Sequence, residues 1–285
     1  MKKKILRLIV GPTASGKTDY SIELARHLES PVISCDSRQI YKELIIGTAP
    51  PTAEQLSQVK HYFIHSHTIH SHYTAGKYEI EALSLLEELF KEHDQLVMVG
   101  GSGLYADAVC YGIDDFPQPD FDLRETLSSR MLNEGIESLR GELKILDRES
   151  YDTIDISNPQ RIIRALEVTI GTGEKFSSFK SFKKKPRSFS IERTLIERPR
   201  EELYDRINKR VDFMMDAGLL EEVKSLYPYR NLTALKTVGY RELFRYLEGN
   251  CSIEEAVDLI KRNTRRYAKR QITWFKRETP SQFLK

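Results

Sequence analysis

Apolar residues gather in four short runs, and longer segments with helical spacing separate these runs. The runs span residues 5–10, 31–34, 95–99 and 190–196, and their lengths suit buried strands. A segment at 78–93 carries apolar residues along one side of a predicted helix. These residues are Ile80, Leu83, Leu86, Leu89 and Phe90. Because strands alternate with helices, we predict an α/β fold in which helices flank a parallel sheet.

Helical patterns dominate the rest of the chain, and the fourth run is expected to be the last strand of the sheet. One helical block extends from 123 to about 182, and four helices follow from residue 200 onward. Prolines and aspartates between 111 and 122 indicate a boundary. We expect a first part of the core at 1–118, an all-helical insertion domain at 119–188, and completion of the core with basic C-terminal helices at 189–285.

The composition is typical of a soluble protein without a membrane segment. The chain has 285 residues, of which 40% are hydrophobic and 30% are charged, and its net charge is +2. No apolar run approaches the ~18 residues of a membrane span. The three cysteines lie far apart and lack metal-binding spacing, which favours reduced thiols and a cytoplasmic location.

The most specific motif is residues 11–18, which read G-P-T-A-S-G-K-T between the first strand and a helix. Glycines in such a loop allow consecutive N–H groups to surround phosphate oxygens, and the helix start adds its positive dipole end. Lys17 supplies a positive charge, and Thr18 offers a hydroxyl to Mg²⁺. A tight turn without a ligand is the alternative, but it explains neither of these two residues. The motif predicts a P-loop NTPase-like core that binds a di- or triphosphate.

Asp36 follows the second strand, so it is expected at the edge of the sheet where α/β proteins bind ligands. Its carboxylate suits a magnesium ligand or a general base. A helix N-cap is an equally good interpretation of the local pattern. The third strand instead ends in Gly100 and Gly101, without the acid that holds magnesium in nucleotide-hydrolysing P-loop proteins. This difference argues against an ordinary ATPase.

Two basic segments favour an anionic polymer or substrate. One spans 261–277 and includes Tyr267, Trp274 and Phe275, and the other spans 180–187, where serines suggest a mobile loop. Interleaved cations and aromatic rings suit RNA. In the alternative, the aromatic rings pack inward and the cations are solvated.

Two other patterns leave structural alternatives open. The histidines between His61 and His72 favour a half-exposed extended stretch over a metal site, because no convergent ligand pair accompanies them.

Asn158 and the proline after it predict a helix start. On that helix Arg164 either binds a ligand or pairs with Glu167, and the isoleucines and leucine that face inward are Ile162, Ile163, Leu166 and Ile170.

Taken in order, several motifs resemble those of the bacterial tRNA dimethylallyltransferases. They are the P-loop and the segments 36–41, 47–49, 100–105, 158–167, 238–240 and 267–275. The resemblance runs from the first strand to Phe275. It implies transfer of a dimethylallyl group from dimethylallyl diphosphate to N6 of the adenosine 3′-adjacent to the anticodon, with Mg²⁺ as cofactor. It also implies that a P-loop core and a helical insertion bind the tRNA anticodon stem-loop. We expect the protein to be a monomer.

The resemblance also implies roles for individual residues. Asp36 would act as the general base, and Arg210 would stabilise the leaving group together with Lys17 and Thr18. Ser102 stands where the family usually has threonine, and its hydroxyl would contact the diphosphate or the RNA. The implied diphosphate-binding residues are Gly11, Pro12, Thr13, Ala14, Ser15, Gly16, Lys17 and Thr18.

The implied tRNA-binding residues come from both parts of the chain. They are Asp36, Ser37, Arg38, Gln39, Ser102, Arg124, Gln160, Arg161, Ile162, Ile163 and Arg164. One departure is the sequence from His61 to His65, which reads H-Y-F-I-H where the family usually reads H-H-L-I-D. No role is assigned to that loop.

Three alternatives compete with this interpretation. An adenylate isopentenyltransferase that modifies free nucleotide would need no large RNA-binding insertion. A P-loop small-molecule kinase would depend on ATP and transfer phosphate. A non-catalytic RNA-binding protein would keep the basic segments but would not need Asp36.

Overall fold

The computed structural model describes residues 3–117, 120–181, 183–277 and 282–284. The chain forms two compact units: Met1–Tyr111 together with Pro186–Lys285, and Gly112–Lys185. The second unit therefore differs at both ends from the predicted insertion at 119–188. The predicted limits 118, 119 and 285 lie outside the described residues, as does residue 182.

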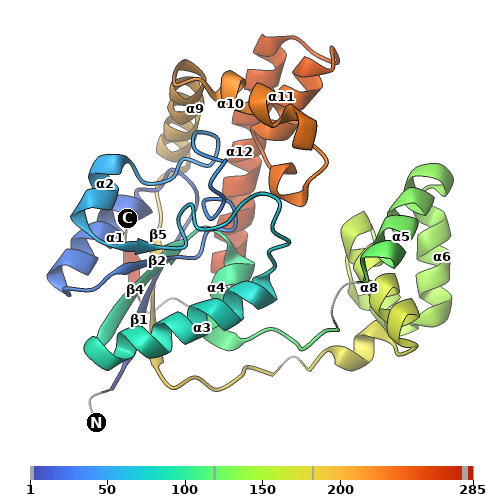
Figure 1. Cartoon of the computed structure of the whole chain (residues 1–285), viewed down its shortest axis with the longest axis horizontal. Coiled ribbons are helices and arrows are strands. Elements are labelled where there is room, and N and C mark those ends of the chain that lie inside the picture. Colours follow the sequence, from blue (N-terminus) through green and yellow to red (C-terminus); the bar gives the residue numbers. More distant parts are fainter. Residues whose placement is uncertain (1–2, 118–119, 182, 278–281, 285) are drawn as a thin grey trace. The chain divides into compact units, whose positions relative to one another are not determined.

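The first unit contains a parallel sheet with the strand order β3-β2-β4-β1-β5-β6. The α/β prediction is therefore confirmed (Figure 1). The strands are β1 (Ile5–Val10), β2 (Val32–Ser34), β3 (His61–Tyr62), β4 (Gln95–Gly100), β5 (Ser190–Ile196) and β6 (Gln282–Leu284).

Expecting β5 to be the last strand was wrong, because β6 adds to the sheet beside it. β6 is three residues long and follows a series of helices, so it has no detectable period of its own. The two-residue strand β3 was missed for the same reason.

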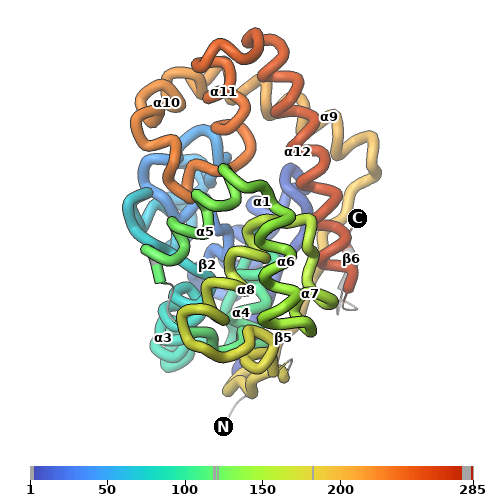
Figure 2. Tube along the Cα trace, turned by 90° about the vertical axis from the view of Figure 1, so that its right-hand side faces the viewer, coloured from blue at the N-terminus to red at the C-terminus, as the bar shows by residue number. Residues whose placement is uncertain are grey.

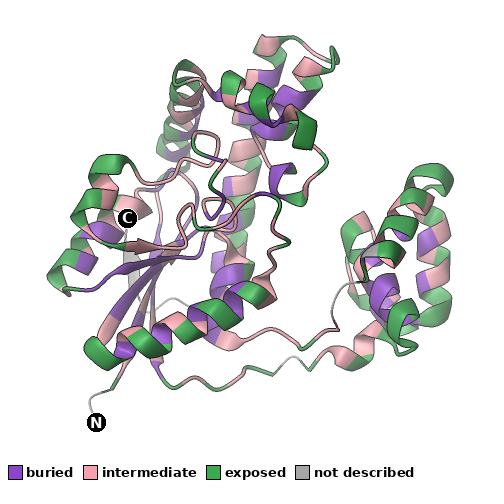
Figure 3. Cartoon of the chain, viewed as in Figure 1, coloured by how far each residue is buried: buried purple, intermediate pink, exposed green. Residues whose placement is uncertain are grey.

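Helices cover both faces of the sheet, which explains why the strands β1, β2 and β4 are largely apolar (Figure 3). Along β1, Leu6 and Leu8 pack in one cluster with α3 (Ala75–Glu92) and α4 (Gly103–Tyr111). Ile9 packs in the opposite cluster with α1 (Lys17–His27). Ile80 was predicted to face the core of α3, but 72% of it is exposed. Ile80 lies two residues after Tyr78 and two before Ala82, so it points away from the buried side of α3 that carries Tyr78, Ala82 and Leu86.

The helices after β5 form a separate core inside the first unit. They are α9 (Arg200–Asp216), α10 (Leu219–Leu226), α11 (Tyr240–Leu247) and α12 (Ile253–Phe275), close to the predicted bounds. Ser252 caps α12 through a capping box with Glu255, as predicted. Short elements complete the unit: α2 (Ala53–Gln58), η2 (Tyr227–Tyr229) and η3 (Thr233–Leu235).

Within its described residues, the second unit contains helices and no strand (Figure 2). The side chain of Asn158 caps α8, as predicted. Ile170 was predicted to face inward, but 40% of it is exposed. The helices are α5 (Phe121–Glu134), α6 (Ile136–Leu146), α7 (Arg148–Thr153), α8 (Pro159–Thr172) and η1 (Phe176–Phe179).

None of the helices in the described ranges combines the length and the apolar character that crossing a bilayer requires.

Candidate active site

A cavity of about 980 Å³ lies in the first unit, where the loops after β1, β2 and β4 meet α9 and α12. This is the carboxyl edge of the parallel sheet, the usual ligand position in α/β folds. Its lining is strongly positive, with seven cationic side chains and two carboxylates. They are Lys17, Arg38, Arg206, Arg210, Lys236, Arg241 and Arg270, and Asp19 and Asp36.

The P-loop borders this cavity from Thr13 to Thr18, whereas Gly11 and Pro12 do not. Gly16 is the N-cap of α1 at a φ of 93°, a conformation that favours glycine. Gly11 is required for another reason, since a Cβ there would lie 2.5 Å from the carbonyl oxygen of Ile196. The loop thus presents the start of α1 to the cavity, while its first glycine fits against β5.

Lys17 lies at the centre of the positive charge. Its Nζ donates to the carbonyl oxygen of Pro12 over 2.6 Å. Burial, followed by the charge of nearby Arg210, lowers the pKa of Lys17 to about 8, and the charge of Asp36 opposes this shift. An anionic ligand would stabilise the charged form of this lysine.

Three arginines from the loop after β5 and from α9 form hydrogen bonds with the P-loop. Arg198 Nε donates to the Ser15 carbonyl over 3.0 Å, and Arg206 Nε donates to the Ala14 carbonyl over 2.8 Å. Arg210 donates to the Thr13 hydroxyl over 3.0 Å, and burial followed by the charge of Arg206 lowers the pKa of Arg210. The sequence analysis missed Arg198 and Arg206, although Arg206 lies one helical turn before Arg210.

Asp36 begins a turn rather than a helix. Its Oδ1 accepts hydrogen bonds from the backbone N–H groups of Arg38, over 2.8 Å, and Gln39, over 3.3 Å. Within the described parts of the chain, Oδ2 accepts no hydrogen bond. One oxygen therefore shapes the turn, as the capping interpretation suggested, while the other is free to act on a ligand.

Ser102 supports this turn from the loop after β4 and does not border the cavity. Its Oγ accepts from the backbone N–H of Ser37 over 2.9 Å and donates to the Ser37 hydroxyl over 3.0 Å. Tyr267 also forms a hydrogen bond with Ser102, and burial raises the pKa of Tyr267 to about 12.

The side chains of the next two residues bind backbone carbonyls. Arg38 donates to the Thr233 carbonyl over 3.2 Å, and Gln39 Nε2 donates to those of Thr48 and Ala49. These bonds hold the turn after β2 against other loops around the cavity.

Gln271 on α12 joins two of the loops at the cavity. Its Oε1 accepts from the Thr13 N–H over 2.8 Å, and its Nε2 donates to the Gly101 carbonyl over 2.8 Å. A Cβ at Gly101 would lie 2.2 Å from Nε2, so this glycine admits Gln271. Trp274 packs inward, as the alternative interpretation of the basic segment proposed, since it is half-buried against the core beside α4 and its Nε1 donates to Asp107 over 2.9 Å. The role of Gln271 was missed because it depends on loops far away in the sequence.

Comparison with known proteins gives one consistent result. Residues 39–278 match the family model described as IPP transferase. The chain belongs to the IPP transferase family. Two similar proteins are named tRNA dimethylallyltransferase. The one from Flavobacterium johnsoniae is 49% identical, with 96% of this chain and 91% of the relative covered. The one from Bacteroides fragilis is 48% identical, with 98% and 92% covered.

A solved structure agrees with these relatives. The tRNA isopentenylpyrophosphate transferase of Bacillus halodurans is 37% identical, with a TM-score of 0.69, and the comparison covers 99% of this chain and 90% of that one. The family model begins after the P-loop and Asp36, but it includes Arg210 and Gln271.

The second unit of this IPP transferase family member carries the remaining predicted RNA contacts. Arg124 donates to Glu167 over 2.7 Å and to Gln160 over 3.0 Å. Arg164 also pairs with Glu167, over 3.0 Å, which confirms the ion pair considered from the sequence. These contacts form one polar network that joins the first turn of α5 to Gln160, Arg164 and Glu167 along α8, and Arg161 on the same helix is exposed.

Ile162 and Ile163 do not suit the RNA-binding role predicted for them. Both are completely buried in the core of the second unit. Their side chains hold α8 in place, because the motif places apolar and polar residues on opposite sides of the same helix.

The histidine segment and the 180–187 segment also differ from expectation. Only His61 and Tyr62 are extended as a strand, and His65 has a left-handed φ of 46°. The described residues contain no group of three side chains suited to a metal. In the basic segment, Arg187 is not solvated but pairs with Glu79 over 2.8 Å, and these side chains are 10% and 9% exposed.

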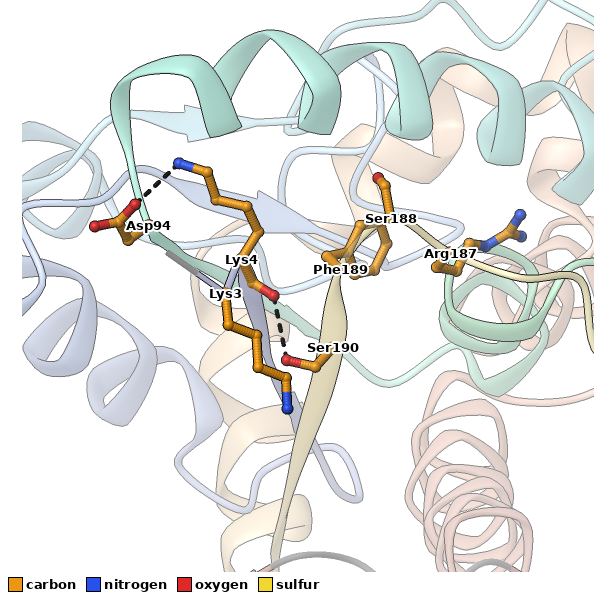
Figure 4. Close-up of a pocket in the computed structure, with 7 residues that line it drawn as sticks. All are labelled: Lys3, Lys4, Asp94, Arg187, Ser188, Phe189 and Ser190. Atoms are coloured by element: carbon orange, nitrogen blue, oxygen red, sulfur yellow. Dashed lines mark hydrogen bonds and ion pairs between the residues drawn. The ribbon is translucent and has the colours of Figure 1, made fainter. Parts of the chain in front are cut away.

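A second hollow, of about 730 Å³, lies near the amino ends of β1 and β5 (Figure 4). Lys4 pairs there with Asp94 over 3.0 Å, and Arg187 points away from Lys3 and Lys4. Two of the three cations that line this hollow, Lys4 and Arg187, pair with carboxylates, so it carries less unopposed positive charge than the larger cavity.

Proposed function

We propose that the chain transfers a dimethylallyl group from dimethylallyl diphosphate to N6 of the adenosine 3′-adjacent to the anticodon of tRNA, releasing diphosphate. The observation that carries this proposal is the cavity itself. It combines a P-loop, several arginines and a carboxylate with one free oxygen. The names of the relatives, tRNA dimethylallyltransferase, support both the donor and the acceptor.

The diphosphate of the donor would bind at the P-loop. The backbone N–H groups between Thr13 and Thr18 and the start of α1 favour negative charge. Lys17 and Arg210 lie beside the loop and would stabilise the charge that grows on the diphosphate as it leaves. Arg206 would act indirectly, by holding the Ala14 carbonyl away from the ligand.

The site also fits Mg²⁺. The Thr18 hydroxyl lines the cavity and takes part in no hydrogen bond among the described residues. Mg²⁺ is usually held by one or two protein oxygens together with substrate phosphates. When bound to Thr18 and the diphosphate, the ion would supply charge neutralisation for the leaving group.

The acceptor adenine would lie beside the turn from Asp36 to Gln39. An adenine amine is a weak nucleophile, so a carboxylate that accepts its proton lowers the barrier. Asp36 Oδ2 would take that proton as the N6–carbon bond forms and the carbon–oxygen bond to the diphosphate breaks. Ser102 would maintain the turn through Ser37. The base must leave its stack to reach a cavity of this kind.

The helical unit would bind the tRNA outside the cavity. Its candidate contacts are the polar residues Arg124, Gln160, Arg161 and Arg164. Arginine donors arranged around one buried carboxylate offer several N–H groups to phosphates. We also propose that the enzyme acts as a monomer in the cytoplasm.

A transfer assay tests this proposal. Purified protein is incubated with Mg²⁺ and radiolabelled dimethylallyl diphosphate, with unmodified tRNA, AMP or ATP alone in parallel. We expect label in tRNA and none in AMP. Label in AMP would instead indicate an adenylate isopentenyltransferase. Consumption of ATP without label transfer would indicate a kinase.

A further inference from the structure

Phe213 projects from the side of α9 that borders the cavity. The residues of α9 and its C-cap that line the cavity are Arg206, Arg210, Phe213, Met214 and Ala217. Their spacing of three or four residues places them on one side of the helix. Phe213 is therefore part of the same row as Arg210, one turn further along.

The exposure of Phe213 is unusual for its size. Its exposed fraction is 71%, and the other large, exposed apolar side chain at this cavity is Ile45, at 58%. Across the described ranges, Phe213 has no aromatic or cation–π partner. An exposed phenyl ring in the lining of a binding cavity offers a large apolar surface to a ligand that enters the cavity.

The surroundings indicate what that ligand is. The exposed cations of the cavity lining are Arg206, Lys236, Arg241 and Arg270. In the described part of the chain, Lys236 and Arg270 form no ion pair with a carboxylate. The exposed acid in the lining, Asp19, accepts a hydrogen bond from Gln55 over 2.6 Å. Cations that share a cavity lining with an exposed ring match a chain of phosphates with unstacked bases.

We propose that Phe213 stacks on an unpaired base of the RNA, next to the base that enters the cavity. This inference rests on the proposed function, since that function supplies an RNA with one base in the cavity. The cations of the cavity lining hold the adjoining phosphates, and the ring supplies a flat apolar surface for a base. Phe213 is then a positioning residue for the acceptor.

A fluorescent RNA measures this contact directly. The probe is an anticodon stem-loop in which 2-aminopurine replaces the base beside the target adenosine, and no donor is added. Stacking on Phe213 quenches the probe, so we expect quenching to be lost in Phe213→Ala and Phe213→Leu. We expect Phe213→Trp to restore it. Leucine keeps an apolar side chain but cannot stack on a base. Comparing Phe213→Leu with Phe213→Trp therefore distinguishes aromatic stacking from burial of any apolar side chain.

Affinity and salt dependence provide an independent measurement. We expect Phe213→Ala to weaken RNA binding about 5- to 150-fold, the range for one lost base–aromatic stack. The slope of affinity against salt should not change, because no phosphate contact is lost. Lys236→Ala should instead reduce that slope by about 1, because one phosphate contact and its released counterion are lost. Ile80→Ala, an equally exposed apolar residue outside the cavity lining, serves as the matched control and should change nothing.

The outcomes separate this inference from the proposed function. Unchanged quenching and affinity in Phe213→Ala, with an active wild-type enzyme, would overturn the stacking proposal alone. A change equal to that of Ile80→Ala would also overturn it. If wild-type protein transfers no dimethylallyl group but its quenching still depends on Phe213, the proposed reaction fails and the RNA contact stands. Self-association that disappears in Phe213→Ala, without loss of RNA binding, would show that the ring is a contact between copies of the chain.

Discussion

Gln271 accepts a hydrogen bond of 2.8 Å from the backbone of Thr13, a residue 258 positions earlier in the chain. The amide of the same side chain donates to the Gly101 carbonyl. Gln271 is 5% exposed, so water cannot easily replace either bond. The last long helix of the chain therefore helps to fix the shape of the P-loop at its beginning.

Replacing Gln271 with leucine should damage donor binding. The change leaves the Thr13 N–H and the Gly101 carbonyl without their buried partner, at a cost of about 1–3 kcal/mol for each unpaired group. We expect the KM for dimethylallyl diphosphate to rise about tenfold or more, with a smaller change in the KM for tRNA. Lys269→Ala, an exposed change on the same helix, is the control. An unaltered donor KM in Gln271→Leu would show that the P-loop keeps its shape without this bond.

Lys17 should give the reaction an alkaline limit. With a pKa of about 8, it is charged below that pH and neutral above it. Because the charged form binds the diphosphate, kcat/KM for the donor should fall as the pH rises through 8. Arg210→Gln removes a charge that lowers the pKa of Lys17, so the fall should move to higher pH even though overall activity drops. A pH profile with the same alkaline limit in both proteins would contradict this assignment.

The variant Asp36→Asn tests the proposed general-base role of Asp36 without removing the hydrogen bonds by which its side chain holds the turn. Asparagine keeps an oxygen that accepts the Arg38 and Gln39 N–H groups, but it cannot take a proton from the adenine amine. We expect the single-turnover rate to fall about 10²- to 10⁴-fold while tRNA affinity and thermal stability stay near wild type. A variant that retains its rate would rule out the general-base role.

Arg187 should matter for stability rather than for RNA. It forms a nearly buried ion pair with Glu79 and donates to the Ala108 and Val109 carbonyls. Arg187→Ala leaves a carboxylate with little access to water, and we expect a loss of about 3 kcal/mol in the free energy of unfolding. Lys183→Ala, an exposed change in the same basic segment, should leave stability unchanged. Equal effects of the two changes in urea denaturation would contradict the structural role.

Local sequence signals predicted the parts of the site that local chemistry determines. The P-loop and Asp36 each lie directly after a strand, so their place at the edge of the sheet follows from the strand pattern. Arg210 was found by resemblance, and its neighbour Arg206 was not, because its task is to bind a backbone carbonyl of a distant loop. Gln271 was missed for the same reason.

The errors have related causes. Ile162 and Ile163 share a motif with polar residues, but the 3.6-residue helix repeat turns them into the core. The short strand β6 is formed by pairing with β5, which no pattern within three residues reveals.

The most direct measurement is mass spectrometry of the nucleosides from tRNA treated with the purified protein, dimethylallyl diphosphate and Mg²⁺. We expect one adenosine per tRNA to gain a dimethylallyl unit on N6, at the position 3′ to the anticodon, and no gain with Asp36→Asn at matched times. Transfer to AMP but not to tRNA, or unmodified tRNA together with phosphate transfer from ATP, would contradict the proposed function.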